Sequence, residues 1–469
     1  MVSIVDPTSA GFLTVESRSQ PMHVGGLQLF RPPEGSGPGY VREMYENALG
    51  DTDVAPLFKK HPVRGVGTAG QWTWAEDDQF DIEHHVRHSA LPQPGRVREL
   101  LDLTSRLHST RMAHERPLWE AHIIEGLADG RVGLYTKMHH ALVDGVSAMR
   151  LTQSVLSTDP GTRDMPSAWA RRPATENLEQ ERDARDASLL DIPLGALRTA
   201  YGIAAEAAGM PSALLKTLSR SVRNENAPVA LYAPRTIFNE KITGSRRFAA
   251  QQWELERLNT VRKAASVTLN DVVLAMCSGA IRAYLSELGA LPETGLVAMV
   301  PISLKMDKAH EASGDGGNAV GLVMAQLATH IADPVDRLST ISTSMDSAKD
   351  AMKSMSPVQL MAMSAIGLAP AIVPPLLGVH GVGRPAFNLI ISNVPGPRQT
   401  MYYNGAELVG MYPLSIPIHG MALNITCTSY AGMLGFGLTG CRRTVPSLQR
   451  LLGHLDDELD ALERGLGVA

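Results

Sequence analysis

The sequence RVGLYTKMHHALVDGVSAMRLTQSV, residues 131–155, contains the pattern that decides the fold and the candidate chemistry of this chain. Its first part, residues 131–138, has the character of a β-strand. Two histidines, His139 and His140, follow that strand, and the run from Val146 to Val155 has helical character. A polar side chain at the end of a strand is well placed to enter a cleft, so these histidines are candidate functional residues.

The chemistry of imidazole explains why a histidine is useful at this position. Its unperturbed pKa of about 6.5 suits proton transfer near neutral pH. When an alcohol attacks a thioester, the alcohol loses a proton and the leaving thiolate gains one; a single imidazole can serve both steps and contributes roughly 10²–10⁴-fold. Asp144, four residues after His140, is expected to orient the loop or the ring. Gly145 is expected to permit a tight turn or a close approach of substrate.

The same residues also have a structural interpretation, because paired histidines and an aspartate often occur without catalysis. A metal site is the third alternative. Adjacent histidines on a strand point to opposite faces, and the three cysteines Cys277, Cys427 and Cys441 have no metal-ligand spacing. We therefore expect no bound metal.

Length and composition limit the class of protein. A chain of 469 residues is two to three times the usual domain size, which predicts two domains. Its 44% hydrophobic and 19% charged residues indicate large buried cores and no extensive disorder. The 43 basic and 48 acidic residues leave a net charge of -5, which argues against nucleic acid as a partner.

Location is predicted from cysteine usage, the N-terminus and one uncharged segment. Three cysteines without a disulfide framework favour the cytoplasm, and residues 1–7 lack the features of a signal peptide. Residues 354–383 contain no Asp, Glu, Lys or Arg, but prolines and glycines interrupt them. We interpret this segment as two short buried or interfacial helices, which leaves open both peripheral membrane contact and a wall of an acyl tunnel.

The remaining elements alternate along the chain and predict two α/β domains with mixed sheets. Strand-like runs are residues 22–30, 131–138, 296–302, 319–330, 387–394, 421–429 and 433–439, and helix-like runs are residues 96–112, 146–155, 195–222, 270–288 and 447–464. The charge-mixed segment 163–191 is typical of a linker or a solvated helix. The predicted division is an N-terminal domain (1–160), linker or crossover helices (161–234) and a C-terminal domain (235–469).

Residues 139–145 resemble the HHxxxDG signature of the chloramphenicol-acetyltransferase-like superfamily. The whole chain is similar to the bacterial wax ester synthase/acyl-CoA:diacylglycerol acyltransferase family. The segments that carry this resemblance, in family order, are Phe12–Glu16 with Met22–Gly25, Pro117–Trp119, Asn270–Ala275, Val300–Leu304 with Gly317–Asn318, and Ser392–Pro397.

The resemblance implies two acetyltransferase-like domains with an active-site tunnel at their interface. It implies that His140 is the general base, that His139 supports it, and that Asp144 is structural or orienting. Asn270 and Asp271 match a second short motif of the family, and Asn270 is a candidate donor to the developing oxyanion.

Four of the matching residues also have a simple structural interpretation. Asn270 and Asp271 follow Thr268 and can cap a helix. Trp119 is a candidate for a substrate-pocket wall or for a core residue. Glu16 is a candidate substrate-binding residue that can instead cap or pair.

The resemblance further implies transfer of a fatty acyl group from acyl-CoA, as co-substrate and without a bound cofactor, to diacylglycerol or a long-chain alcohol. The products are triacylglycerol or wax ester, storage lipids that predict peripheral association with the inner membrane face or with lipid droplets. Two alternatives remain: a condensation-type domain that uses carrier-protein thioesters, and a lipid-binding or droplet-coating protein with little activity, since one fold hosts many functions.

Overall fold

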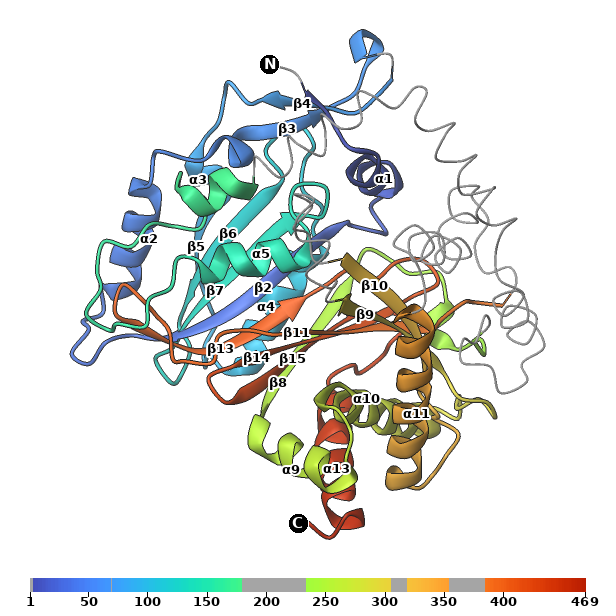
Figure 1. Cartoon of the computed structure of the whole chain (residues 1–469). Coiled ribbons are helices and arrows are strands. Elements are labelled where there is room, and N and C mark those ends of the chain that lie inside the picture. Colours follow the sequence, from blue (N-terminus) through green and yellow to red (C-terminus); the bar gives the residue numbers. More distant parts are fainter. Residues whose placement is uncertain (1–2, 69, 179–232, 305–318, 354–383) are drawn as a thin grey trace.

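The computed structural model describes residues 3–68, 70–178, 233–304, 319–353 and 384–469 (Figure 1). Two of the predicted segments, residues 195–222 and 354–383, lie outside these residues, as does part of the predicted linker.

Two six-stranded mixed sheets form the framework of the described residues (Figure 1). The first has the strand order β12 (Tyr402–Tyr403), β13 (Ala406–Leu414), β2 (His23–Arg31), β7 (Val132–His139), β6 (Trp119–Glu125) and β5 (Val86–Ala90). The second has the order β10 (Ala319–Gln326), β9 (Val297–Leu304), β11 (Leu389–Val394), β14 (Leu423–Tyr430), β15 (Met433–Cys441) and β8 (Arg246–Glu254). Each sheet contains parallel and antiparallel pairs.

Helices cover both sheets. The second sheet packs against α9 (Leu255–Ala265), α10 (Leu269–Glu287), α11 (Pro334–Lys353) and α13 (Arg450–Gly465) around the largest apolar core of the described residues (Figure 1). The other helices of the described residues are α1 (Pro7–Val15), α2 (Tyr40–Gly50), α3 (Ile82–His85), α4 (Val97–Ser109) and α5 (Gly145–Gln153), with short 3-10 helices at Pro56–Lys59, Val66–Thr68 and Ile237–Asn239. A small sheet of β1 (Ser3–Ile4), β4 (Thr73–Glu76) and β3 (Lys60–Val63) lies beside α1 (Figure 1).

The two halves of the chain are joined by more than the linker. Strands β12 and β13, which come late in the sequence, complete the sheet of the N-terminal residues, and β13 pairs antiparallel with β2. Helix α4 also approaches the edge strand β8, where the hydroxyls of Ser105 and Ser109 accept hydrogen bonds from the backbone N–H groups of Phe248 and Arg246. Such bonds satisfy an exposed sheet edge and hold the two sheets together.

The mixed α/β architecture predicted from the sequence is confirmed, and so are its main elements. The strand predicted at residues 131–138 is β7, and the helix predicted at residues 270–288 is α10. The start of α10 follows from a capping box, in which Thr268 and Asp271 satisfy each other's backbone N–H groups. The proposed division at residues 160 and 234 stays a prediction, although β13 crosses from the predicted C-terminal domain into the first sheet.

Among the described residues, no single helix is both long and apolar enough to cross a membrane. Helices α9 and α10 together reach the necessary length and apolar composition, but as a pair bent by 102°. Most residues of α10 are buried in the core of the second sheet.

Candidate active site

The backbone of His140 is held by neighbours on both sides. Strand β7 ends at His139, and the N–H of His140 then donates to the carbonyl of Met22 at 2.8 Å, beside the start of β2. The carbonyl of His139 accepts from the N–H groups of Leu142 and Val143, which closes a tight turn. The turn therefore presents His140 at a fixed place where the strand ends.

The ring of His140 stacks on a residue of α1. The Phe12 ring lies 4.1 Å from it between centroids, with an interplanar angle of 26°. Stacking of this kind restricts rotation of the imidazole. Helix α1 begins at Pro7 because Asp6 is its N-cap. The Asp6 carboxylate accepts from the N–H groups of Thr8 and Ser9, both at 3.0 Å.

His140 lies where two cavities meet. The larger cavity, of about 370 Å³, lies between β2, β7, β13 and α5 on one side and β9, β11 and β14 on the other. The smaller cavity, of about 190 Å³, lies between the start of α1 and the turn that follows β7. His140 and Asp144 line both cavities. A reacting group at His140 can thus be approached from two directions.

Burial keeps the His140 ring neutral near physiological pH. Burial lowers its pKa below 6.5, and the nearby Asp144 carboxylate raises it in part. A hydrogen bond from the ring to its own backbone acts in the same direction as Asp144. Nδ1 is the ring nitrogen nearer in the covalent structure to the residue's own backbone, so we assign that bond to Nδ1 and infer that Nε2 is the nitrogen that accepts a proton.

Asp144 organises the helix that follows the turn. It is the N-cap of α5: Oδ1 accepts from the N–H groups of Val146 at 3.0 Å and Ser147 at 2.9 Å, and Oδ2 accepts from the Ser147 hydroxyl at 2.9 Å. Both carboxylate oxygens are therefore committed to the helix. Gly145 adopts no positive φ, and a Cβ built there would lie 4.0 Å from Val24 at the cavity wall. The turn itself does not require a glycine, so of the two expected roles, a tight turn or a close approach of substrate, the second stays a prediction. The absent side chain leaves room in the larger cavity.

His139 points away from the cavities and belongs to a buried polar cluster. Its Nδ1 accepts from the N–H of Ala141 at 3.0 Å, and its Nε2 lies 3.5 Å from Oε1 of Glu16. Glu16 also accepts from the N–H of Met22 at 3.0 Å and contacts Nε2 of His114 at 2.6 Å. Burial alone raises the pKa of Glu16, but its contacts with His114, His139 and Met22 outweigh burial and lower it to about 2. Glu16 thus supports the turn that carries His140 and lines neither of the two cavities.

The donor atoms of Glu16, His114 and His139 lie within 4.8 Å of one another, a spacing that a metal ion can use. The hydrogen bonds of His139 do not fit that use. Because Nδ1 accepts from Ala141, the neutral ring carries its proton on Nε2, the atom that would have to bind the metal. Arg111 also lies 3.9 Å from Glu16 and adds positive charge. The cluster fits a hydrogen-bonded support better than a metal site.

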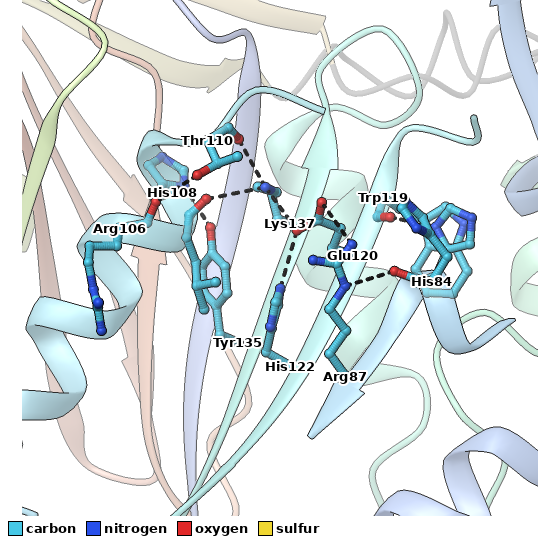
Figure 2. A network of polar contacts seen from close by, with 12 residues as sticks. His84, Arg87, Arg106, His108, Thr110, Trp119, Glu120, His122, Tyr135 and Lys137 are labelled. Atoms are coloured by element: carbon cyan, nitrogen blue, oxygen red, sulfur yellow. Dashed lines mark hydrogen bonds and ion pairs between the residues drawn. The ribbon is translucent and has the colours of Figure 1, made fainter. Parts of the chain in front are cut away.

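A second buried network surrounds Lys137 (Figure 2). Lys137 is two residues before His139 on β7, so both side chains lie on the same face of the sheet. The side chain of Lys137 is fully buried; its Nζ pairs with Glu120 at 3.0 Å and donates to the carbonyls of Leu107 and Thr110. These carbonyls belong to the last turn and C-cap of α4, which a cation stabilises. Burial lowers the pKa of Lys137, while Glu120 raises it. The network anchors α4 beneath the sheet and leaves the opposite face for the cavities.

Trp119 is a core residue. Its ring stacks on Trp169 at 5.2 Å and on His85 at 4.7 Å, and its Nε1 donates to the carbonyl of Phe58 at 2.9 Å. Its surface is 1% exposed, and it lines neither cavity at His140.

Asn270 and Asp271 lie in the first turn of α10, away from the walls of those two cavities. Oδ2 of Asp271 accepts from the backbone N–H of Thr268 at 2.9 Å and from the Thr268 hydroxyl at 2.7 Å, within the capping box. Of the predicted site residues, the structure therefore brings His140, Asp144 and Gly145 together at the cavities. His139 and Glu16 support them from behind.

Sequence reasoning missed several residues at this site. Phe12 was noted only as part of a matching segment, and Gln28 and Asn424 were not singled out at all. The Asn424 amide oxygen accepts from the Thr426 hydroxyl at 2.8 Å on the wall of the larger cavity, which leaves its Nδ2 as a donor. A polar amide side chain within a strand, Gln28 in β2 and Asn424 in β14, is the signal that could have identified these two residues.

Comparisons with known proteins agree with this geometry. Residues 5–273 match the model of the wax ester synthase/diacylglycerol acyltransferase catalytic domain, and residues 316–463 match the model of the WS/DGAT C-terminal domain. A Mycobacterium tuberculosis protein called a probable diacyglycerol O-acyltransferase is 46% identical over the whole of both chains.

Solved structures give the same result. A wax ester synthase/diacylglycerol acyltransferase from Marinobacter aquaeolei VT8 aligns with a TM-score of 0.78 and 41% identity, over 99% of this chain and 100% of that one. The starter condensation domain of rhizomide synthetase shares the fold at a TM-score of 0.56 and 12% identity, over 99% of this chain and 94% of that one. The histidine at two cavities and the full-length matches together lead to one conclusion. The chain belongs to the wax ester synthase/diacylglycerol acyltransferase family.

Proposed function

We propose that this acyltransferase moves a fatty acyl group from acyl-CoA to the hydroxyl of diacylglycerol or a long-chain alcohol, with His140 as general base. The observation that carries this proposal is the position of the His140 ring, half-buried and shared by two cavities. A transferase of two substrates needs a base that both can reach. The names of the relatives support the choice of substrates.

The reaction needs one proton acceptor and no covalent acyl-enzyme. Nε2 of His140 takes the proton of the alcohol as its oxygen forms a bond to the thioester carbonyl carbon. When the tetrahedral intermediate collapses, the carbon–sulfur bond breaks and the imidazolium gives its proton to the CoA thiolate. Burial favours this cycle because it keeps the resting ring neutral.

The oxyanion of the intermediate needs hydrogen-bond donors. Asn270 remains a candidate for this role only by resemblance, since it does not line the described cavities. Ser392, Ser415 and Asn424 line the larger cavity and carry side-chain donors. We propose that one of these supplies the contact, which is commonly worth about 3–4 kcal/mol where tested.

The larger cavity suits a fatty chain. Its walls are mostly apolar and include Met138, Met149, Met299 and Met411. Methionine side chains adapt to irregular apolar shapes, which favours a flexible alkyl chain over a rigid ligand. The smaller cavity offers hydroxyl groups from Thr8, Ser9 and Ser147 and so suits a more polar group.

The long-chain acceptors also bear on location. Because diacylglycerol and fatty alcohols partition into bilayers, we propose a cytoplasmic protein that contacts the membrane or lipid droplets peripherally. Flotation with lipid vesicles that contain dipalmitoylglycerol tests this, and a protein that stays wholly unbound would contradict it.

The test of the reaction is release of free CoA from palmitoyl-CoA, with hexadecanol or dipalmitoylglycerol as acceptor. We expect acceptor-dependent release that falls roughly 10²–10⁴-fold in His140→Ala. The matched control is His88→Ala, a histidine of β5 that pairs with Glu125 and lines neither cavity. It is expected to retain activity.

The outcomes separate the alternatives. A wild type that binds palmitoyl-CoA but transfers nothing to either acceptor would support the lipid-binding alternative. Transfer only from a carrier-protein thioester would support the condensation-type alternative. A folded His140→Ala variant with full activity would refute the general base.

A further inference from the structure

Gln28 is an unusual residue within β2. It is 4% exposed, and its amide nitrogen is buried without a hydrogen bond to any described residue. A buried amide without a hydrogen-bond partner destabilises the state that contains it. The unmet hydrogen bond lowers the equilibrium constant for forming that state by about 5- to 150-fold. Such a group needs an explanation in function or in structure.

Gln28 separates two cavities. It lines the larger cavity and also a third cavity of about 30 Å³. Among the described residues, Thr136 and Thr152 are the other two that line both of these cavities. Beyond them the third cavity is lined mainly by apolar side chains such as Phe30, Leu134 and Trp169. The three shared residues therefore form a polar partition between two apolar spaces.

Of the three residues of this partition, Gln28 lies about one fatty chain away from His140, whereas Thr136, four residues before His140 on the β7 side, is nearer, at about 13 Å. The backbone of His140 bonds to Met22, and Gln28 is six residues further along β2, or about 20 Å at a rise of about 3.3 Å per residue. An extended alkyl chain advances about 1.25 Å per carbon, from bonds of about 1.5 Å and angles of about 111°. A chain of about 16 carbons whose carbonyl or hydroxyl end lies at His140 therefore ends near Gln28.

We propose that Gln28, with Thr136 and Thr152, sets the upper limit to the length of the alkyl chain that the larger cavity accepts. This inference rests on the proposed function, because it assigns the cavity to an acyl donor or acceptor chain. A chain that stops before Gln28 leaves room for water to bond to its amide. A longer chain excludes that water and leaves the amide without any partner.

The decisive variant is Gln28→Met, which keeps the length of the side chain and removes the amide. Gln28→Ala also removes bulk and joins the two cavities. We expect each variant to raise the ratio of kcat/KM for chains of about 20 carbons to that for about 12 carbons, by about 5- to 150-fold. The matched control is Gln153→Met, because the Gln153 amide nitrogen is also buried and unpartnered but lines none of the three cavities. Its ratio should stay at the wild-type value.

Two series of substrates identify the chain that reaches Gln28. In one, the acyl-CoA varies in length with a short alcohol held constant; in the other, the alcohol varies with a short acyl-CoA. The series in which Gln28→Met changes the ratio of kcat/KM for long and short chains shows whether the acyl chain or the alcohol chain reaches Gln28. A ratio that is unchanged in both series, in folded variants that transfer acyl groups, would overturn the inference and leave the proposed function standing.

Binding without turnover keeps the two proposals distinguishable. If the wild type transfers no acyl group, the proposed function fails, and the Kd values of fatty acids of about 12 to 20 carbons then test the partition by the same ratio. A Gln28→Met variant that loses activity with dipalmitoylglycerol but not with hexadecanol would also overturn the inference. It would show that the amide binds an ester oxygen instead of limiting a chain.

Discussion

The role of Asp144 can be tested by separating its hydrogen bonds from its charge. The carboxylate accepts from two backbone N–H groups and one hydroxyl at the start of α5, four residues after His140. Asp144→Ala removes all three bonds. Asp144→Asn keeps one oxygen that can accept from both backbone N–H groups of the N-cap and removes the negative charge. Its amide NH2 then faces the Ser147 hydroxyl, to which it donates instead of accepting.

The magnitude follows from the geometry. Loss of an N-cap destabilises by about 0.5–2 kcal/mol, which lowers the Tm by no more than a few degrees in a chain of this size. The effect on activity should be larger, since a displacement of about 1 Å at a reacting group can cost about 10²-fold. We therefore expect Asp144→Ala to lose about 10²-fold in kcat/KM while remaining folded. Asp144→Asn should retain most activity and shift the acid limb of its pH profile downward, because Asp144 raises the pKa of His140.

The assay is CoA release as a function of pH, together with a thermal melt of each variant. Asp333→Ala is the matched control: Asp333 caps α11 through the N–H groups of Val335 and Asp336, both at 2.9 Å, and lies away from the cavities. It should show the same loss of stability with no loss of activity. The reasoning is refuted if Asp144→Asn is as inactive as Asp144→Ala, since the charge would then act on the chemistry directly.

Three further predictions concern the wild type and the cluster behind the turn. The kcat/KM should rise with pH with a midpoint below 6.5, because the base must be neutral and burial lowers the pKa of His140; a midpoint above 6.5 would contradict this. Glu16, with a pKa of about 2 against 4.5, should contribute up to about 3 kcal/mol of stability that is present above pH 4.5 and lost as the pH falls toward 2. Urea unfolding from pH 7 to 3 should show this loss in the wild type and not in Glu16→Gln; equal slopes would argue against it. Chelators should leave activity unchanged, because Nδ1 of His139 accepts from Ala141 and its Nε2 therefore carries the proton that a metal would have to displace. Inactivation by EDTA with recovery on addition of zinc would support a metal site instead.

Local structure at the site was predictable because it depends on residues close together in the sequence. The strand–turn–helix pattern of residues 131–155 needs only the periodicity of its side chains and a cap at Asp144. The same holds for α10, whose start at Thr268 and Asp271 is a local capping box. The identification of His140 as the central residue rested on that pattern and on its resemblance to a family motif.

Long-range relations were not predictable from periodicity. Glu16 and His114 are 98 residues apart, yet their side chains meet at 2.6 Å behind His139. Neither residue has a local feature that indicates this partner. Trp119 illustrates the converse, because a large aromatic residue in a matching segment proved to be held in the core by Phe58 and Trp169.

The sequence by itself determined the secondary structure around His140, the mixed α/β class and the family. Only the tertiary structure decided that β13 enters the first sheet, that His140 lines two cavities, and that Gln28 lies on the walls of the larger cavity and of a third one. The physical reason is that a cavity is the space left between packed elements. Its walls come from strands as distant in sequence as β2 and β14, and their approach depends on the packing of both sheets, which no local pattern records.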